Sequence, residues 1–217
     1  MHATPVEAPR RRIRAVWLEV PAGLLVLAAI VWLRWHEPGY AERVAPVRVE
    51  GVSGHRVQAR NFAVEVDAGG LQVAKTLLGP PATSLATEPV VVGTPGVWLS
   101  VPARIEALRE EGMVSAIVRT RDGLVYQSGG SDRPKAPALN LDERFVAPGL
   151  PEQGRYYFEL PPDRLEGARI QLFWGGLVPG SNDALVDVDL GIDAGRARAL
   201  LGRAGTLDVR GVDGVRR

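Results

Sequence analysis

The chain has 217 residues, of which 46% are hydrophobic and 24% are charged, and this is the composition of a globular protein, not a disordered one. Glycine (25 residues) and proline (17 residues) are frequent, which favours short strands and many turns. Cysteine is absent, so disulfide frameworks, thiol nucleophiles and cysteine–zinc sites are excluded. With three histidines in the whole chain, a histidine-based metal cluster is nearly excluded as well.

The net charge of +1 hides an uneven distribution. Residues 1–14 hold four Arg and one Glu, and residues 194–217 hold six Arg and two Asp. The long segment 44–193 carries a net charge of −5. Both ends of the chain are therefore basic and the centre is mildly acidic.

Residues 15–33 are the first predicted element, and they carry a single charge, Glu19. A helix of this length spans about 28 Å, close to the ~30 Å hydrocarbon core of a bilayer. Trp17 lies near one end, and Trp32 and Trp35 near the other, where their rings suit the headgroup regions. The apolar residues show no one-sided periodicity, which argues against a buried helix of a soluble domain. We therefore expect a transmembrane helix.

The flanking charges predict the orientation of this helix. A cluster of arginines precedes it: Arg10, Arg11, Arg12 and Arg14. Positive flanks stay in the cytoplasm, so residues 1–14 should be cytoplasmic and the rest extracytoplasmic, in a single-pass protein of the cell membrane. A cleaved signal peptide is the alternative, but no Ala-x-Ala site closes the apolar run. We expect an uncleaved signal anchor, followed by a linker over residues 34–43.

After the linker the pattern changes to period 2. In residues 61–66, Phe62, Val64 and Val66 share one face, and residues 96–108 continue the alternation over a longer run. Further short apolar runs span 47–52, 71–78, 89–93, 113–120, 123–128, 155–160, 168–174 and 184–190. These runs predict an all-β fold, an antiparallel β-sandwich over residues 44–193.

Two local signals complete the predicted fold. Arg121-Asp122-Gly123 lies between two strand patterns, and Asp-Gly suits the positive φ values of a tight hairpin turn. Residues 194–203 predict a short helix, and the basic tail 204–217 is expected to be disordered.

The stretch from Gly93 to Asp193 shows a family resemblance. Its motifs read GVWLSVPARIEAL, RTRDGLVYQSGGSDR, RFVAPGLPEQGRYYFELPPDRLEGARIQL and VDVDLGID. Together they are similar to the telokin-like, immunoglobulin-like domain of unknown function on bacterial, often actinobacterial, membrane-anchored surface proteins. The resemblance covers roughly 100 of the 217 positions and implies an immunoglobulin-like sandwich with an accessory or binding role.

One segment resembles a nucleotide-binding loop, but the residues that follow it do not suit such a site. Residues 69–76, GGLQVAKT, come within one residue of the phosphate loop G-x-x-x-x-G-K-[ST], with Ala74 in place of the second glycine. The following LLGPP cannot form the helix that such a loop needs. We expect no phosphate-binding site here.

Other candidate site residues also favour structural roles. Asp183, Asp187, Asp189 and Asp193 lack the spacing of a calcium loop, and Asp187 and Asp189 are expected on the solvated face of the last strand. His55 has a nearby serine but no nucleophile elbow, so an exposed turn is expected. The aromatic residues are expected in the core or at its rim: Tyr126, Tyr156, Tyr157, Phe158 and Trp174.

The sequence therefore predicts a single-pass, membrane-anchored, extracytoplasmic binding or accessory protein. No catalytic residue, metal ligand or cofactor is assigned. The expected partners are the lipid bilayer and another membrane or envelope protein, and not nucleic acid; the basic tail has anionic lipid or a wall polymer as its best partner, if it has one. An extracytoplasmic hydrolase or metal-dependent enzyme, with a site assembled from scattered loop residues, is the alternative.

Overall fold

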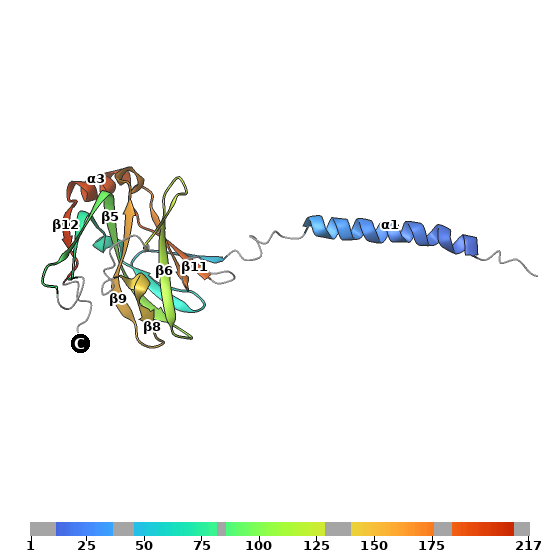
Figure 1. Cartoon of the computed structure of the whole chain (residues 1–217), viewed down its shortest axis with the longest axis horizontal. Coiled ribbons are helices and arrows are strands. Elements are labelled where there is room, and N and C mark those ends of the chain that lie inside the picture. Colours follow the sequence, from blue (N-terminus) through green and yellow to red (C-terminus); the bar gives the residue numbers. More distant parts are fainter. Residues whose placement is uncertain (1–11, 37–45, 82–85, 129–139, 176–183, 211–217) are drawn as a thin grey trace, which may run out of the picture. The chain divides into compact units, whose positions relative to one another are not determined.

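The computed structural model describes residues 12–36, 46–81, 86–128, 140–175 and 184–210. The chain divides after Val44 into two compact units. The first unit contains helix α1 (Arg12–His36), and the second contains two β-sheets and the remaining helices (Figure 1).

Helix α1 includes the predicted segment 15–33 and extends beyond it at both ends. Every residue from Pro21 to Trp35 is exposed, including Leu25 (72% exposed) and Leu27 (62% exposed). Among the residues that the structure describes, no helix combines the length and apolar character required for a membrane span.

The second unit is a two-sheet sandwich. Sheet A has the order β1-β11-β10-β6-β7, and β8 also pairs with β6. Its strands are β1 (Val47–Gly51), β11 (Ala184–Asp189), β10 (Arg169–Trp174), β6 (Gly112–Arg119), β7 (Val125–Gln127) and β8 (Phe145–Val146).

Sheet B has the order β12-β4-β5-β3-β2, and β9 also pairs with β5. Its strands are β12 (Gly205–Asp208), β4 (Gln72–Gly79), β5 (Val90–Ala107), β3 (Phe62–Val66), β2 (Arg56–Gln58) and β9 (Glu152–Leu160).

Short helices complete the second unit. They are the 3₁₀ helices η1 (Ala68–Gly70), η2 (Leu141–Glu143) and η3 (Pro162–Arg164), and the α-helix α3 (Ala194–Gly202). Helix α3 confirms the helix expected over 194–203. It contributes Ala197 to the main core, and its partly buried Leu200 packs against that core.

The core lies between the two sheets, and strand alternation builds it. Along β5, Leu99, Val101 and Ile105 point inward and are fully buried, because successive side chains of a strand face opposite sides of the sheet. Tyr156 and Phe158 on β9 are equally buried and stack at a ring-centroid distance of 6.5 Å. The period-2 pattern thus correctly predicted which residues of β5 face the core.

The predicted hairpin at residues 121–123 is also confirmed. Strands β6 and β7 are antiparallel, and Gly123 N–H donates to Thr120 O at 2.9 Å. Gly123 has φ +88°, a conformation that glycine adopts without steric cost.

Two of the strand pairs correct the prediction of a wholly antiparallel sandwich. Strand β1 pairs with β11, and β12 pairs with β4, both in parallel. The period-2 pattern shows that a segment is a strand, but it does not show the direction of the partner strand. Three strands of two to four residues (β2, β8 and β12) were missed because they are too short to show alternation.

The two strands expected at 89–93 and 96–108 form one strand, β5. The turn-like residues between them form a β-bulge, where the register against β4 shifts. At Gly96 an added Cβ would lie 2.6 Å from the carbonyl oxygen of Leu160. Here glycine permits close approach of β5 and β9, and it does not end the strand.

The prediction of disorder over residues 204–217 was wrong for its first part. Residues 205–208 form β12 beside β4, and Val209 is 1% exposed in a cluster with Trp98 and Tyr157. Burial of these apolar side chains stabilises a segment whose arginines suggested a solvated tail. Residues 211–217 lie outside the described residues.

Candidate functional site

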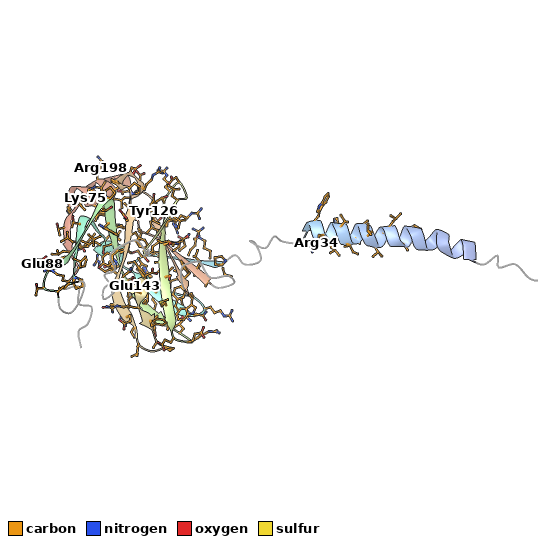
Figure 2. The ribbon with its side chains drawn as sticks, in the orientation of Figure 1. Arg34, Lys75, Glu88, Tyr126, Glu143 and Arg198 are labelled. Atoms are coloured by element: carbon orange, nitrogen blue, oxygen red, sulfur yellow. The ribbon has the colours of Figure 1, made fainter. Side chains whose placement is uncertain are left out.

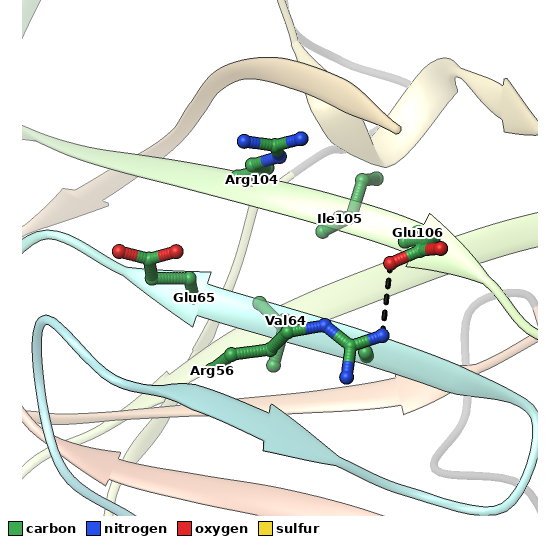
Figure 3. Close-up of a pocket in the computed structure, with 7 residues that line it drawn as sticks. Arg56, Val64, Glu65, Arg104, Ile105 and Glu106 are labelled. Atoms are coloured by element: carbon green, nitrogen blue, oxygen red, sulfur yellow. Dashed lines mark hydrogen bonds and ion pairs between the residues drawn. The ribbon is translucent and has the colours of Figure 1, made fainter. Parts of the chain in front are cut away.

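A charged groove lies on the outer face of sheet B (Figure 3). It has a volume of about 210 Å³ and is lined by Arg56, Ala63, Val64, Glu65, Arg104, Ile105 and Glu106. These residues come from β2, β3 and β5. Because Val64 and Ile105 face the core, the alternating charged neighbours must face outward.

One wall of the groove is an ion pair. The Arg56 guanidinium donates from Nη2 to Glu106 Oε2 at 2.9 Å. In the strand register, Arg56 lies opposite Glu65, whereas Glu106 lies opposite Ala63. Arg56 therefore passes its direct neighbour and reaches diagonally across the small Ala63, which is 1% exposed.

The other two charged residues of the groove do not form an ion pair with each other. Glu65 and Arg104 are directly opposite each other on β3 and β5. Within the part of the chain that the structure describes, neither side chain forms a hydrogen bond or an ion pair, and Figure 3 shows no contact between them. The groove therefore presents one available carboxylate and one available guanidinium.

The next arginine along this face is already engaged. Arg155 donates from Nε to Ser100 Oγ and from Nη2 to Gly70 O, both at 2.6 Å. Its partial burial lowers the pKa of the guanidinium below its usual range. Arg155 thus joins β9 to β5 and to η1, a structural role.

A second pocket, of about 420 Å³, lies at the β6–β7 hairpin and is also charged. Here the charges pair with one another: Arg121 contacts Glu166 at 3.1 Å, and Arg164 contacts Asp122. The Thr120 hydroxyl donates to Asp122 at 2.5 Å and is the main cause of a lowered pKa of that carboxyl. These contacts hold the hairpin against η3.

Asp187 lies on the outer face of sheet A, and its position corrects a prediction. It was expected on a solvated face, but its side chain is fully buried. Three groups donate to it: Arg48 Nη2 at 2.6 Å, and Arg169 Nε and Gln171 Nε2 at 2.5 Å each. Because the donors come from β1 and β10 on either side of β11, only the strand register brings them together.

The other aspartates considered as calcium ligands are not gathered at one site. Asp189 has a 60% exposed side chain and pairs with Arg169 at 3.2 Å. Asp193 caps helix α3 by accepting from Arg196 N–H at 2.7 Å. Asp183 lies outside the described residues. Among the residues that are described, no group of three or more His, Asp or Glu side chains could hold a metal ion.

A buried polar cluster on β6 was missed by the sequence analysis. Between its pairings with β7 and β8, this edge of β6 has no partner strand. Side chains form hydrogen bonds with its backbone instead. Tyr156 Oη donates to Val114 O at 2.8 Å, and Asp142 Oδ1 accepts from Ala116 N–H at 3.2 Å. Burial raises the pKa of Asp142 above its usual value of 3.8. This cluster replaces missing strand hydrogen bonds, and no sequence pattern signals it.

The two remaining motifs behave as predicted. His55 is exposed, in the turn between β1 and β2. In the loop-like motif 69–76, the two glycines belong to η1, and the following residues form strand β4, not a helix. A phosphate loop requires a helix at this place, whereas this chain forms a strand there.

No protein-family model matches the chain, and neither does any curated protein. Similar solved structures include an uncharacterized β-sandwich protein from Clostridium difficile 630, with 12% identity, a TM-score of 0.42, and coverage of 70% of this chain and 99% of that one. The secreted protein MPT63 from Mycobacterium tuberculosis has 18% identity, a TM-score of 0.36, and coverage of 65% and 97%. The yjhA protein from Bacillus subtilis has 12% identity, a TM-score of 0.39, and coverage of 63% and 98%. Because these TM-scores are below 0.5, the sandwich assignment rests on the sheets themselves.

Proposed function

We propose that this chain is a single-pass, membrane-anchored protein whose extracytoplasmic β-sandwich binds a membrane or envelope partner and catalyses no reaction. The observation that carries the proposal is the apolar character of α1. From Pro21 to Trp35 the helix carries almost only apolar side chains, and the only charge in this stretch is Arg34. A helix that is apolar on all sides needs a non-aqueous environment.

Lipid is the best environment for this helix. The uncharged run from Val20 to Leu33 contains leucine, valine, isoleucine and alanine around the whole helix, and Trp32 and Trp35 follow at one end. Tryptophan favours the membrane interface. The arginines before residue 15 support a cytoplasmic N-terminus, and they support a sandwich on the opposite side of the membrane.

The edges of the two sheets support a binding role for the sandwich. Strands β1 and β2 lie at sheet edges, and sheet edges and end loops are the surfaces through which such domains make contacts. A membrane anchor raises the effective concentration of a weak binder toward the millimolar range, so modest contacts with a membrane partner suffice. The telokin-like family resemblance of residues 93–193 supports the same role.

The anchor can be tested in the full chain by cell fractionation. The wild type should stay with membranes after extraction with alkaline carbonate. Leu25→Arg combined with Leu27→Arg places two charges in α1, at about 2.5–3.5 kcal/mol each on insertion scales, and should move the chain to the soluble fraction.

The matched control is Leu150→Arg, since Leu150 is an equally exposed leucine of the sandwich (66% exposed). This variant should remain in the membrane fraction. A wild-type chain that carbonate extracts completely, or a double variant that stays in the membrane, would contradict the anchor.

A further inference from the structure

We propose that the groove between β2, β3 and β5 binds a small zwitterionic ligand of the amino-acid or short-peptide type. Glu65 would pair with the ammonium group of the ligand and Arg104 with its carboxylate. The inference rests on the proposed binding role of the sandwich, and it extends that role to a ligand class.

The charges of the groove are the first argument. Glu65 and Arg104 face each other across adjacent strands, where Cβ atoms lie about 5 Å apart and opposite charges usually pair. In this structure they do not pair, and both are available to a ligand. Arginine binds carboxylates through two parallel N–H donors, and a carboxylate accepts from an ammonium group. A zwitterion satisfies both groups, whereas a ligand with only one charge leaves the other group without a partner.

The Arg56–Glu106 ion pair beside them favours a ligand that carries one positive and one negative charge. Because Arg56 is held by Glu106 at 2.9 Å, it does not neutralise Glu65, its direct neighbour in the register. The two arginines and two glutamates of the groove sum to no net charge. A ligand without net charge therefore leaves the site balanced.

The size of the groove limits the ligand. Its volume of about 210 Å³ lies below the ~300–1,000 Å³ range of pockets for drug-sized ligands. The small Ala63 is among the residues that line it. An amino acid or a dipeptide is the appropriate size, and because exposed ion pairs contribute about 1 kcal/mol or less each, the affinity for such a ligand should be weak.

The test uses ¹⁵N-labelled full-length chain in detergent, with glycylglycine as the probe. We expect saturable shifts of the amide signals of residues 63–65 and 104–106. N-acetylglycylglycine amide, which carries neither charge, should cause none. Glu65→Gln and Arg104→Gln should each weaken glycylglycine binding at least fivefold, while the remaining signals show that the sandwich is folded.

Glu143→Gln and Arg198→Gln are the matched controls. Both residues are exposed and lie outside the groove (Figure 2), so these variants should bind as the wild type does. The proposal is overturned if no shift saturates, if the capped peptide binds equally, or if Glu65→Gln and Arg104→Gln leave binding unchanged. It is also overturned if acetate and methylammonium, added together as separate ions, reproduce the shifts at equal concentration.

The glycylglycine binding test is independent of the test of the membrane anchor. A chain that binds glycylglycine but is extracted from membranes by carbonate contradicts the anchor and keeps the ligand site. A chain that stays in the membrane but does not bind keeps the anchor and contradicts the ligand site.

Discussion

Replacing Asp187 by asparagine removes the one fully buried charge of sheet A while keeping its shape. Asp187 accepts from Arg48, Arg169 and Gln171 at 2.5–2.6 Å. Removing one partner of a fully buried ion pair costs about 3–5 kcal/mol. The side chains of Arg48 and Arg169 are 45% and 29% exposed, so water partly compensates them, and we expect a smaller loss of about 2–3 kcal/mol.

Thermal unfolding of the full chain in one detergent, followed by near-ultraviolet circular dichroism, measures this loss. In a unit of this size each kcal/mol lowers Tm by about 2–4 °C, so Asp187→Asn should lower it by about 4–12 °C. The control is Asp189→Asn, because Asp189 is 60% exposed and exposed pairs contribute about 1 kcal/mol or less. Equal Tm values for Asp187→Asn and the wild type, or a larger drop for Asp189→Asn, would refute the buried cluster.

Three further predictions concern the interior of the sandwich. Tyr156→Phe leaves a carbonyl of β6 without its 2.8 Å donor and should lower the free energy of unfolding in urea by about 1–2 kcal/mol; an unchanged urea midpoint would contradict this. Gly96→Ala brings a Cβ against a carbonyl of β9 and should cost about 1–3 kcal/mol, whereas Gly93→Ala, whose Cβ meets open space, should cost less. Because burial raises the pKa of Asp142, its contribution to stability falls as pH rises from about 3.8 through the raised pKa. The free energy of unfolding of Asp142→Asn, relative to the wild type, should therefore increase between about pH 4 and pH 7; a constant difference would show that Asp142 titrates normally.

The sandwich could be predicted because its strands alternate regularly. Residues 96–108 show which side chains face the core, and Asp122-Gly123 marks a turn that local backbone geometry alone explains. The sequence does not show which strands pair or in which direction. β1 and β12 are short edge strands, and their parallel direction depends on where the chain returns in space. The sequence divides β5 into two runs, 89–93 and 96–108, because it does not show the close approach of β9 at Gly96.

The candidate sites could be predicted only in part. Asp187 and Asp189 occupy the same side of one strand, so the sequence treats them alike. The register places Gln171 opposite Asp187, and Arg48 reaches Asp187 from the neighbouring strand. Asp189, in contrast, is the last residue of β11, and its side chain is 60% exposed. Glu65 and Arg104 of the groove are separated by 39 positions (65 to 104), and neither belongs to a motif. Only the pairing of β3 with β5 brings them together.

The central claim, an anchored sandwich on the extracytoplasmic side of the membrane, can be tested by cysteine labelling. The chain has no cysteine of its own, so single substitutions report their own position. Asp163 is well suited, since its side chain is 73% exposed on the sandwich, and Ala3 reports on the N-terminus. Asp163→Cys should react with a membrane-impermeant maleimide in intact cells, and Ala3→Cys should react only after the cells are permeabilised. Labelling of Ala3→Cys but not of Asp163→Cys in intact cells would contradict the proposed topology.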